Sequence, residues 1–132
     1  MNKWALAWGS AFGVMLLADG LWLGLLMKNF YKNALGDLFR NDPNWVAAAL
    51  FYIAYPIGLT LFVTSRAWNI NDASLPGVAL WGALFGLFAY GTYDLTNLAT
   101  VRGWPLQIVL VDILWGMFAS ALACAVSWRV SR

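Results

Sequence analysis

The sequence predicts an all-α membrane protein: a four-transmembrane-helix bundle that forms a single domain of residues 1–132. Three observations support this fold class. The chain is 62% hydrophobic and only 11% charged, whereas a soluble domain carries roughly 25% charged residues. Four apolar segments each approach the ~20 residues that a helix needs to cross the hydrocarbon core of a bilayer. The alternation of apolar and polar residues that a membrane-spanning β-barrel requires is absent.

The four predicted spans cover residues 4–27, 45–64, 78–99 and 106–128. In NDPNW, we expect Asp42 to be the N-cap of the second span and Pro43 its first helical residue. Ser74 and Pro76 precede the third span, and Gly103 in RGWP is a helix stop. Tryptophans near the span ends predict an aromatic belt at the membrane interfaces. They are Trp4, Trp45, Trp68, Trp104 and Trp128.

The first loop, KNFYKNALGDLFRNDPN, is the longest connection and has an amphipathic pattern. Tyr31, Leu35, Leu38 and Phe39 share one helical face, and Lys32 lies on the opposite face. This pattern is typical of a short helix that lies in the membrane interface. An irregular loop with some apolar residues is the alternative.

The charges at the span ends do not fix the orientation. Four basic residues lie on the side of the termini and four on the other side, so the positive-inside rule gives no bias. Those on the termini side lie closest to the spans, and we therefore expect both termini in the cytoplasm. Equal charge is also expected of a chain that inserts in both orientations and pairs antiparallel. The two groups are Lys3, Arg66, Arg129 and Arg132, and Lys28, Lys32, Arg40 and Arg102.

The absence of His and Glu, and the presence of a single cysteine, Cys124, exclude several kinds of site. A disulfide framework, a Cys–His zinc site, a His-ligated haem and a Ser-His-Asp triad all need residues that this chain lacks. Three aspartates could hold only a hard cation such as Mg²⁺ or Ca²⁺, and we predict no cofactor and no metal. The net charge of +2 is too small and too dispersed to predict a nucleic-acid partner.

Asp19, Asp94 and Asp112 are the only acidic residues inside the spans. An aspartate at the centre of a span costs about 2.5–3.5 kcal/mol on insertion scales, which makes it a candidate functional residue. With a helical rise of about 1.5 Å per residue, Asp19 lies about 12 Å, Asp94 about 8 Å and Asp112 about 10 Å from a span end. Because successive spans alternate in direction, these three ends belong to one membrane face. We therefore expect the three carboxyls in one layer, nearest the first and third loops.

Aromatic and polar side chains are expected in the same layer. The spans carry the patterns DxLW, YxxY, YxxY and DxLW in chain order, which hints at a pseudo-symmetric central site. Two readings of this layer remain open. The carboxyls are either hydrogen-bonded staples that fix helix packing, or the wall of a cavity that holds a cation, a proton or a polar headgroup. The accompanying residues are Trp22, Tyr52, Tyr55, Tyr90, Tyr93, Asn97 and Trp115.

Small residues recur at four-residue intervals in three of the spans, a spacing that allows close helix contact within the chain or between subunits. They are Gly9, Gly13, Gly20 and Gly24 in the first span, Gly82 and Gly86 in the third, and Gly116, Ser120 and Cys124 in the fourth.

Three segments resemble a known family: DGLWLGLLMKNFYKNALGDL, PNWVAAALFYIAYPIGL and YDLTNLATVRGWPLQIVLVDILWG. The sequence resembles the bacterial inner-membrane family called domain of unknown function 2177 over nearly its whole length. The resemblance implies a multi-pass protein of four spans in the bacterial inner membrane, and it implies no activity. The residues that match the family pattern are Asp19, Trp22, Tyr52, Tyr93, Asp94, Asn97, Trp104, Pro105, Asp112 and Trp115.

Three functions are compatible with these features. The first is a small protein that binds or carries an amphipathic or cationic small molecule or lipid, with proton coupling through the carboxyls. The second is an intramembrane lipid-modifying enzyme or accessory that uses Asp–Tyr pairs for acid–base chemistry, although the sequence contains no strong nucleophile. The third is a structural subunit of a larger membrane complex. The expected partners are membrane lipids and a second copy of the chain or another membrane protein.

Overall fold

The computed structural model describes residues 2–132, and every regular element in that range is helical. The α-helices are α1 (Lys3–Leu21), α2 (Lys28–Leu35), α3 (Trp45–Leu59), α4 (Ser65–Ala67), α5 (Leu75–Thr100) and α6 (Leu106–Ser131). Two π-helical segments, Trp22–Leu26 and Thr60–Thr64, continue α1 and α3, and a 3₁₀ turn, Gly36–Leu38, follows α2. The predicted all-α fold class is confirmed.

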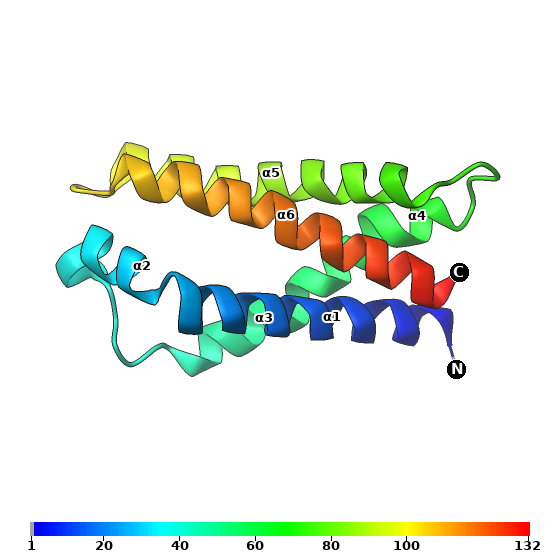
Figure 1. Cartoon of the computed structure of the whole chain (residues 1–132), viewed down its shortest axis with the longest axis horizontal. Coiled ribbons are helices and arrows are strands. Elements are labelled where there is room, and N and C mark those ends of the chain that lie inside the picture. Colours follow the sequence, from blue (N-terminus) through cyan, green and yellow to red (C-terminus); the bar gives the residue numbers. More distant parts are fainter. Residues whose placement is uncertain (1) are drawn as a thin grey trace.

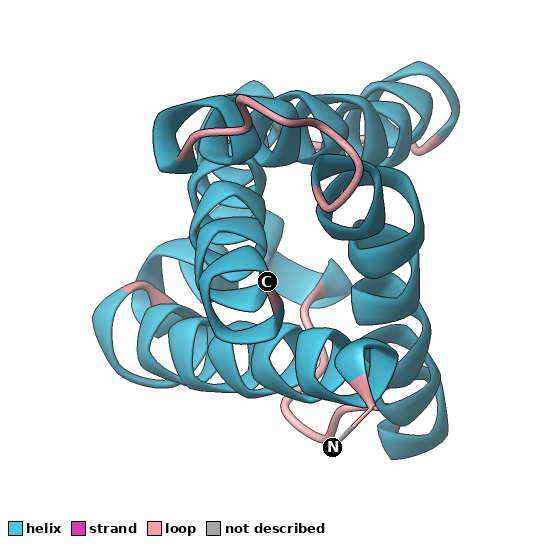
Figure 2. Ribbon diagram, turned by 90° about the vertical axis from the view of Figure 1, so that its right-hand side faces the viewer, coloured by secondary structure: helices cyan, strands magenta, loops and turns pink. Residues whose placement is uncertain are grey.

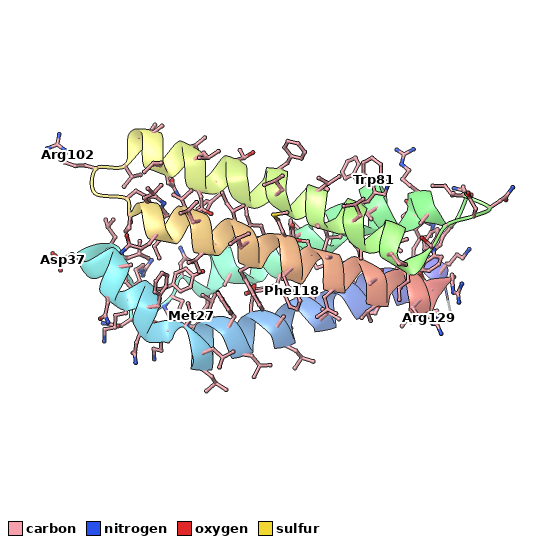
Figure 3. The ribbon with its side chains drawn as sticks, turned by 45° about the horizontal axis from the view of Figure 1, so that its top comes forward. Met27, Asp37, Trp81, Arg102, Phe118 and Arg129 are labelled. Atoms are coloured by element: carbon pink, nitrogen blue, oxygen red, sulfur yellow. The ribbon has the colours of Figure 1, made fainter. Side chains whose placement is uncertain are left out.

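Four helical stretches are long and apolar enough to cross a membrane: Lys3–Leu26, Trp45–Ala67, Leu75–Thr100 and Leu106–Ser131. They agree with the four predicted spans to within a few residues. In Figure 1, α2 and the turn between α5 and α6 lie at one end of the bundle, and both termini lie at the other. Figure 3 places Asp37 and Arg102 together at the first end and Arg129 at the second. The first and third loops therefore share one side of the bundle.

The helix boundaries confirm two of the predictions and correct one. Ser74 caps α5 by accepting a hydrogen bond from the backbone N–H of Gly77 (3.2 Å), and Gly103 adopts a positive φ of 79° after the helix end. The prediction for the second span was wrong. Asn44, not Asp42, caps α3, and its side chain accepts from the N–H of Ala47 (3.1 Å). Asparagine caps as well as aspartate does and here stands next to the first helical residue, which leaves Asp42 and Pro43 in the loop.

Helices α5 and α6 make the most extensive contact in the bundle, and their small residues allow it. A Cβ atom on Gly82 would lie 2.8 Å from the carbonyl oxygen of Ser120, and one on Gly86 would lie 2.8 Å from the Ser120 hydroxyl. Gly116 receives the ring of Tyr90 in the same way. These glycines therefore set the distance between the two helices.

The glycines of α1 do not serve this purpose within the chain. A Cβ on any of them would meet no atom within 4 Å, whereas the buried residues of α1 lie on another face of the helix. The glycine residues are Gly9, Gly13 and Gly20 of α1 and Gly24 of the π-helical segment that continues it, and the buried residues are Ala7, Ala11, Met15 and Asp19.

The second span crosses the bundle rather than running along one neighbour. Helix α3 packs against α1, and the segment Thr60–Thr64 that continues it contacts α5 and α6. Figures 1 and 2 show this inclined course, with the four spans arranged around the long axis of the molecule. Because the backbones of α3 and α5 make little direct contact, space is left between them in the half nearest the first and third loops.

Candidate functional site

Asp19 of α1 is held by donors from two other spans. The hydroxyl of Tyr52 (α3) donates to Oδ2 of Asp19 at 2.6 Å, and the indole N–H of Trp115 (α6) donates to Oδ1 at 2.7 Å. Asp19 is only 6% exposed. Both oxygens of this buried carboxyl therefore have a hydrogen-bond donor.

Asp112 of α6 is held by a similar chain of donors. The hydroxyl of Tyr31 (α2) donates to Oδ1 of Asp112 at 3.1 Å, and the indole N–H of Trp22 donates to the Tyr31 oxygen at 3.1 Å. The rings of Trp22 and Trp115 stack at 4.3 Å with an interplanar angle of 3°. The two DxLW sequences are thus linked reciprocally, because the tryptophan of each one supports the aspartate of the other, directly or through Tyr31.

Asp94 of α5 lies in a different environment. It is fully buried, and its polar neighbours are the carboxyl of Asp112 and the indole N–H of Trp104. Within residues 2–132, neither oxygen of Asp94 accepts a hydrogen bond, and the buried N–H of Trp104 donates none. Two carboxyls can share a hydrogen bond only if one of them carries a proton. The Asp94–Asp112 pair is therefore the least satisfied polar contact of the site.

A cavity of about 530 Å³ lies between the four spans, and Asp19, Asp112 and Trp115 contribute to its wall. Most of its wall is buried or half-buried, but three of its residues are exposed: Leu23 of the first span (43%), Phe51 of α3 (38%) and Tyr93 of α5 (56%). The cavity therefore reaches the surface of the bundle, and at Phe51 and Tyr93 it does so about 10 Å from the helix ends, within the hydrocarbon depth of a bilayer. The wall consists of Asp19, Leu23, Ala48, Phe51, Tyr52, Tyr55, Ala89, Tyr90, Tyr93, Asp112 and Trp115.

Most of the predicted site residues meet in this wall, and three do not. Asp94 lies beside Asp112 instead of in the wall, Trp22 lies behind the stacked ring of Trp115, and Asn97 is half-buried away from the cavity. Tyr55 lines the wall, but its hydroxyl pairs with the hydroxyl of Ser120 at 2.6 Å. The predicted residues that do line the cavity are Asp19, Tyr52, Tyr55, Tyr90, Tyr93, Asp112 and Trp115.

Tyr31 also belongs to this network, although the sequence pattern placed it only on the apolar face of the first loop. It is buried on the apolar face of α2 and bridges Trp22 to Asp112. Burial, together with the nearby Asp112 carboxyl, raises the pKa of the Tyr31 phenol, so the phenol remains a neutral donor at ordinary pH. A tyrosine on the apolar face of an amphipathic helix was the available signal, because its hydroxyl needs a partner when the ring is buried.

The chemistry available at this site is limited by its residue types. Its polar groups are carboxyls, phenols and indole N–H groups, and among residues 2–132 no three His, Cys, Asp or Glu side chains are grouped so as to hold a metal ion. Carboxylates attract cations, and the faces of Tyr, Trp and Phe rings bind them by cation–π contact. The wall is therefore suited to a positively charged group that carries apolar substituents.

The comparisons with known proteins identify a family. The family model described as predicted membrane proteins of unknown function (DUF2177) matches residues 4–129. No curated protein and no solved structure matches the chain.

Proposed function

The chain belongs to this family of predicted membrane proteins, whose description gives no activity. We therefore propose its function from the site itself. The protein binds an amphipathic cation, such as an organic ammonium compound or an amine-bearing lipid, in the cavity between Asp19 and Asp112. The observation that carries the proposal is a cavity with two carboxyls and six aromatic side chains in its wall.

The size of the cavity supports a small-molecule ligand. Its volume of about 530 Å³ lies within the range of about 300–1,000 Å³ that is typical of ligand sites. Such sites have mainly apolar walls with a few convergent polar groups, as here. Trp115 lies in the wall, and its ring is held in place by stacking on the ring of Trp22.

The charges of the site support a cation over an anion or a neutral ligand. Both oxygens of Asp19 accept hydrogen bonds, and its carboxyl remains in the wall. Asp112 uses only Oδ1 for the hydrogen bond with Tyr31. Every Lys and Arg of the chain lies outside the interior of the spans, so no basic side chain occupies the place of the ligand.

The position of the opening supports an amphipathic ligand. Phe51 and Tyr93 lie at a depth where the surface of the bundle faces lipid tails, so a ligand can enter sideways from the bilayer. An apolar substituent can then remain at this opening while the charged group lies near Asp112. We further expect this site in the bacterial inner membrane, in the leaflet nearest the first and third loops.

The test is calorimetric titration of the full chain in lipid nanodiscs with benzyltrimethylammonium and with neopentylbenzene, in which carbon replaces the charged nitrogen. We expect the cation to bind and the neutral isostere to bind at least ten-fold more weakly. Asp112→Asn should weaken binding of the cation by a factor of ten or more, which corresponds to about 1.4 kcal/mol.

The matched control is Asp72→Asn, which removes the same charge from a separate cavity of about 420 Å³ between the end of the second span and the start of α5. This variant should bind the cation as the unaltered protein does. Equal binding of the cation and its isostere, or an equal loss in both variants, would contradict the proposal.

A further inference from the structure

We propose that Asp94 and Asp112 form a proton-sharing carboxyl pair, which holds one proton when the cavity is empty and releases it when a monovalent cation binds beside Asp112. The exchange rests on the proposed function, whereas the retention of the proton does not. The pair would make cation binding and proton binding mutually exclusive.

Asp94 is buried with no hydrogen bond to its carboxyl oxygens within residues 2–132, although the indole N–H of Trp104 lies nearby. The neighbouring carboxyl of Asp112 can serve as a partner only through a proton held between them. An ionised, unpaired carboxylate at this depth would be strongly unfavourable, since charged groups in an apolar medium need compensation.

The titratable groups that face the pair from the surrounding elements are all acidic. Asp19 comes from α1, Tyr31 from α2, and Tyr90 and Tyr93 from α5, and each lies within electrostatic range of Asp112. All of them are acids or phenols, so none supplies the positive charge that two ionised carboxylates would need. Like charges at such close range favour retention of one proton by the pair. The basic residues nearest to this end of the bundle are exposed: Lys28, Lys32, Arg40 and Arg102.

Only one carboxyl of the pair lies in the wall of the cavity. Asp112 is half-buried and contributes to the wall, whereas Asp94 lies behind it and does not. A cation in the cavity therefore meets the outer carboxyl first, and its effect reaches the inner carboxyl through the shared proton. Tyr31 keeps Oδ1 of Asp112 in place during this change, because its own bond with Trp22 fixes the phenol.

The exchange balances in charge. The pair with one proton carries a charge of −1, and after loss of that proton it carries −2. A monovalent cation bound beside Asp112 restores the sum to −1, so the buried site has the same total charge in both states. Since a change of net charge in a low-dielectric site is costly, we expect one proton to leave for each cation that enters.

The experiment is titration of benzyltrimethylammonium into the full chain in nanodiscs at pH 7, in two buffers with different heats of ionisation. This probe carries no exchangeable proton, so any proton released comes from the protein. We expect release of close to one proton per bound cation in the unaltered protein and in the control Asp72→Asn. The Asp94→Asn variant is nearly isosteric with the unaltered protein, and its amide can donate to Asp112. We expect this variant to bind the cation and to release almost no protons.

A second measurement needs no ligand. Infrared spectroscopy of the empty protein at pH 7 should show the carbonyl band of a protonated carboxylic acid, and Asp94→Asn should remove it. Binding without proton release would overturn the exchange and leave the proposed function intact. Failure of the cation to bind would overturn both the proposed function and the exchange, and the infrared band would then decide whether the pair holds a proton. Absence of the band from the unaltered protein would overturn the proton-sharing pair.

Discussion

The contact between α5 and α6 leads to a prediction about Gly82, where the two helices lie too close for a Cβ atom. In Gly82→Ala the new Cβ would be 2.8 Å from the carbonyl oxygen of Ser120 and 2.9 Å from the Cβ of Cys124. Ordinary contacts begin at 3.4 Å, so the helices must separate by about 0.6 Å at this point (3.4 Å minus 2.8 Å). Neither neighbouring atom can rotate away, because one belongs to the backbone and the other is bonded directly to it.

The expected loss of stability follows from two opposing effects. Overpacking of this kind costs about 1–3 kcal/mol, and the rigid neighbours favour the upper end of that range. Replacement of a helical glycine by alanine contributes about 1 kcal/mol in the opposite direction. We therefore expect Gly82→Ala to lower the free energy of unfolding by about 2 kcal/mol.

The matched control is Gly13→Ala on α1, where a Cβ would meet no atom within 4 Å. Only the helix-propensity effect remains there, so this variant should be more stable by up to about 1 kcal/mol. The free energies can be measured by reversible unfolding in mixed micelles, followed by tryptophan fluorescence. If Gly82→Ala is as stable as Gly13→Ala, the inferred role of close α5–α6 packing is wrong. A destabilised Gly13→Ala that also dissociates would instead place the α1 glycines against a second copy of the chain.

Two further predictions concern the first loop and the start of α3. The raised pKa of Tyr31 means that the folded protein holds the phenolic proton more tightly than the unfolded chain does. The contribution of Tyr31 to stability is therefore full below about pH 10 and is lost as the pH rises further. Unfolding free energies measured from pH 8 to 11 should therefore fall less steeply in Tyr31→Phe than in the unaltered protein, and parallel curves would contradict this. Asn44→Ala should lower stability by about 1 kcal/mol through loss of the cap on Ala47, whereas Asp42→Ala should change it by less than about 0.5 kcal/mol; equal losses would show that Asn44 is not the cap.

The sequence was sufficient to place the spans and the depth of the polar residues. Span length follows from the thickness of the bilayer, and the depth of a side chain follows from a fixed rise per residue along a helix. The depths of Asp19 and Asp112 could therefore be estimated without coordinates, and both carboxyls lie in the wall of one cavity. The two DxLW sequences lie in the first and fourth spans, and the tryptophan of each is linked by hydrogen bonds to the aspartate of the other.

The same reasoning could not fix which way a residue faces or which partner it finds. Asn97 shares the depth of the layer but lies away from the cavity, and Asp94 faces α6 instead of the open space. Tyr31 enters the site from a loop helix whose direction depends on the π-helical segment Trp22–Leu26 before it. These outcomes depend on helix rotation and separation, for which a single sequence gives only weak signals.

The sequence by itself thus determined that this protein is a four-span membrane bundle with three aspartates inside its spans, because hydrophobic length and helical rise are properties of each segment alone. Only the tertiary structure decided that Asp19 accepts two hydrogen bonds and that Asp112 borders a cavity. It also decided that Asp94 is buried beside Asp112 and accepts no hydrogen bond from residues 2–132. The physical reason is that hydrogen bonds and cavities arise between segments. Their geometry is set by the inclined course of the second span and by the close packing of α5 on α6.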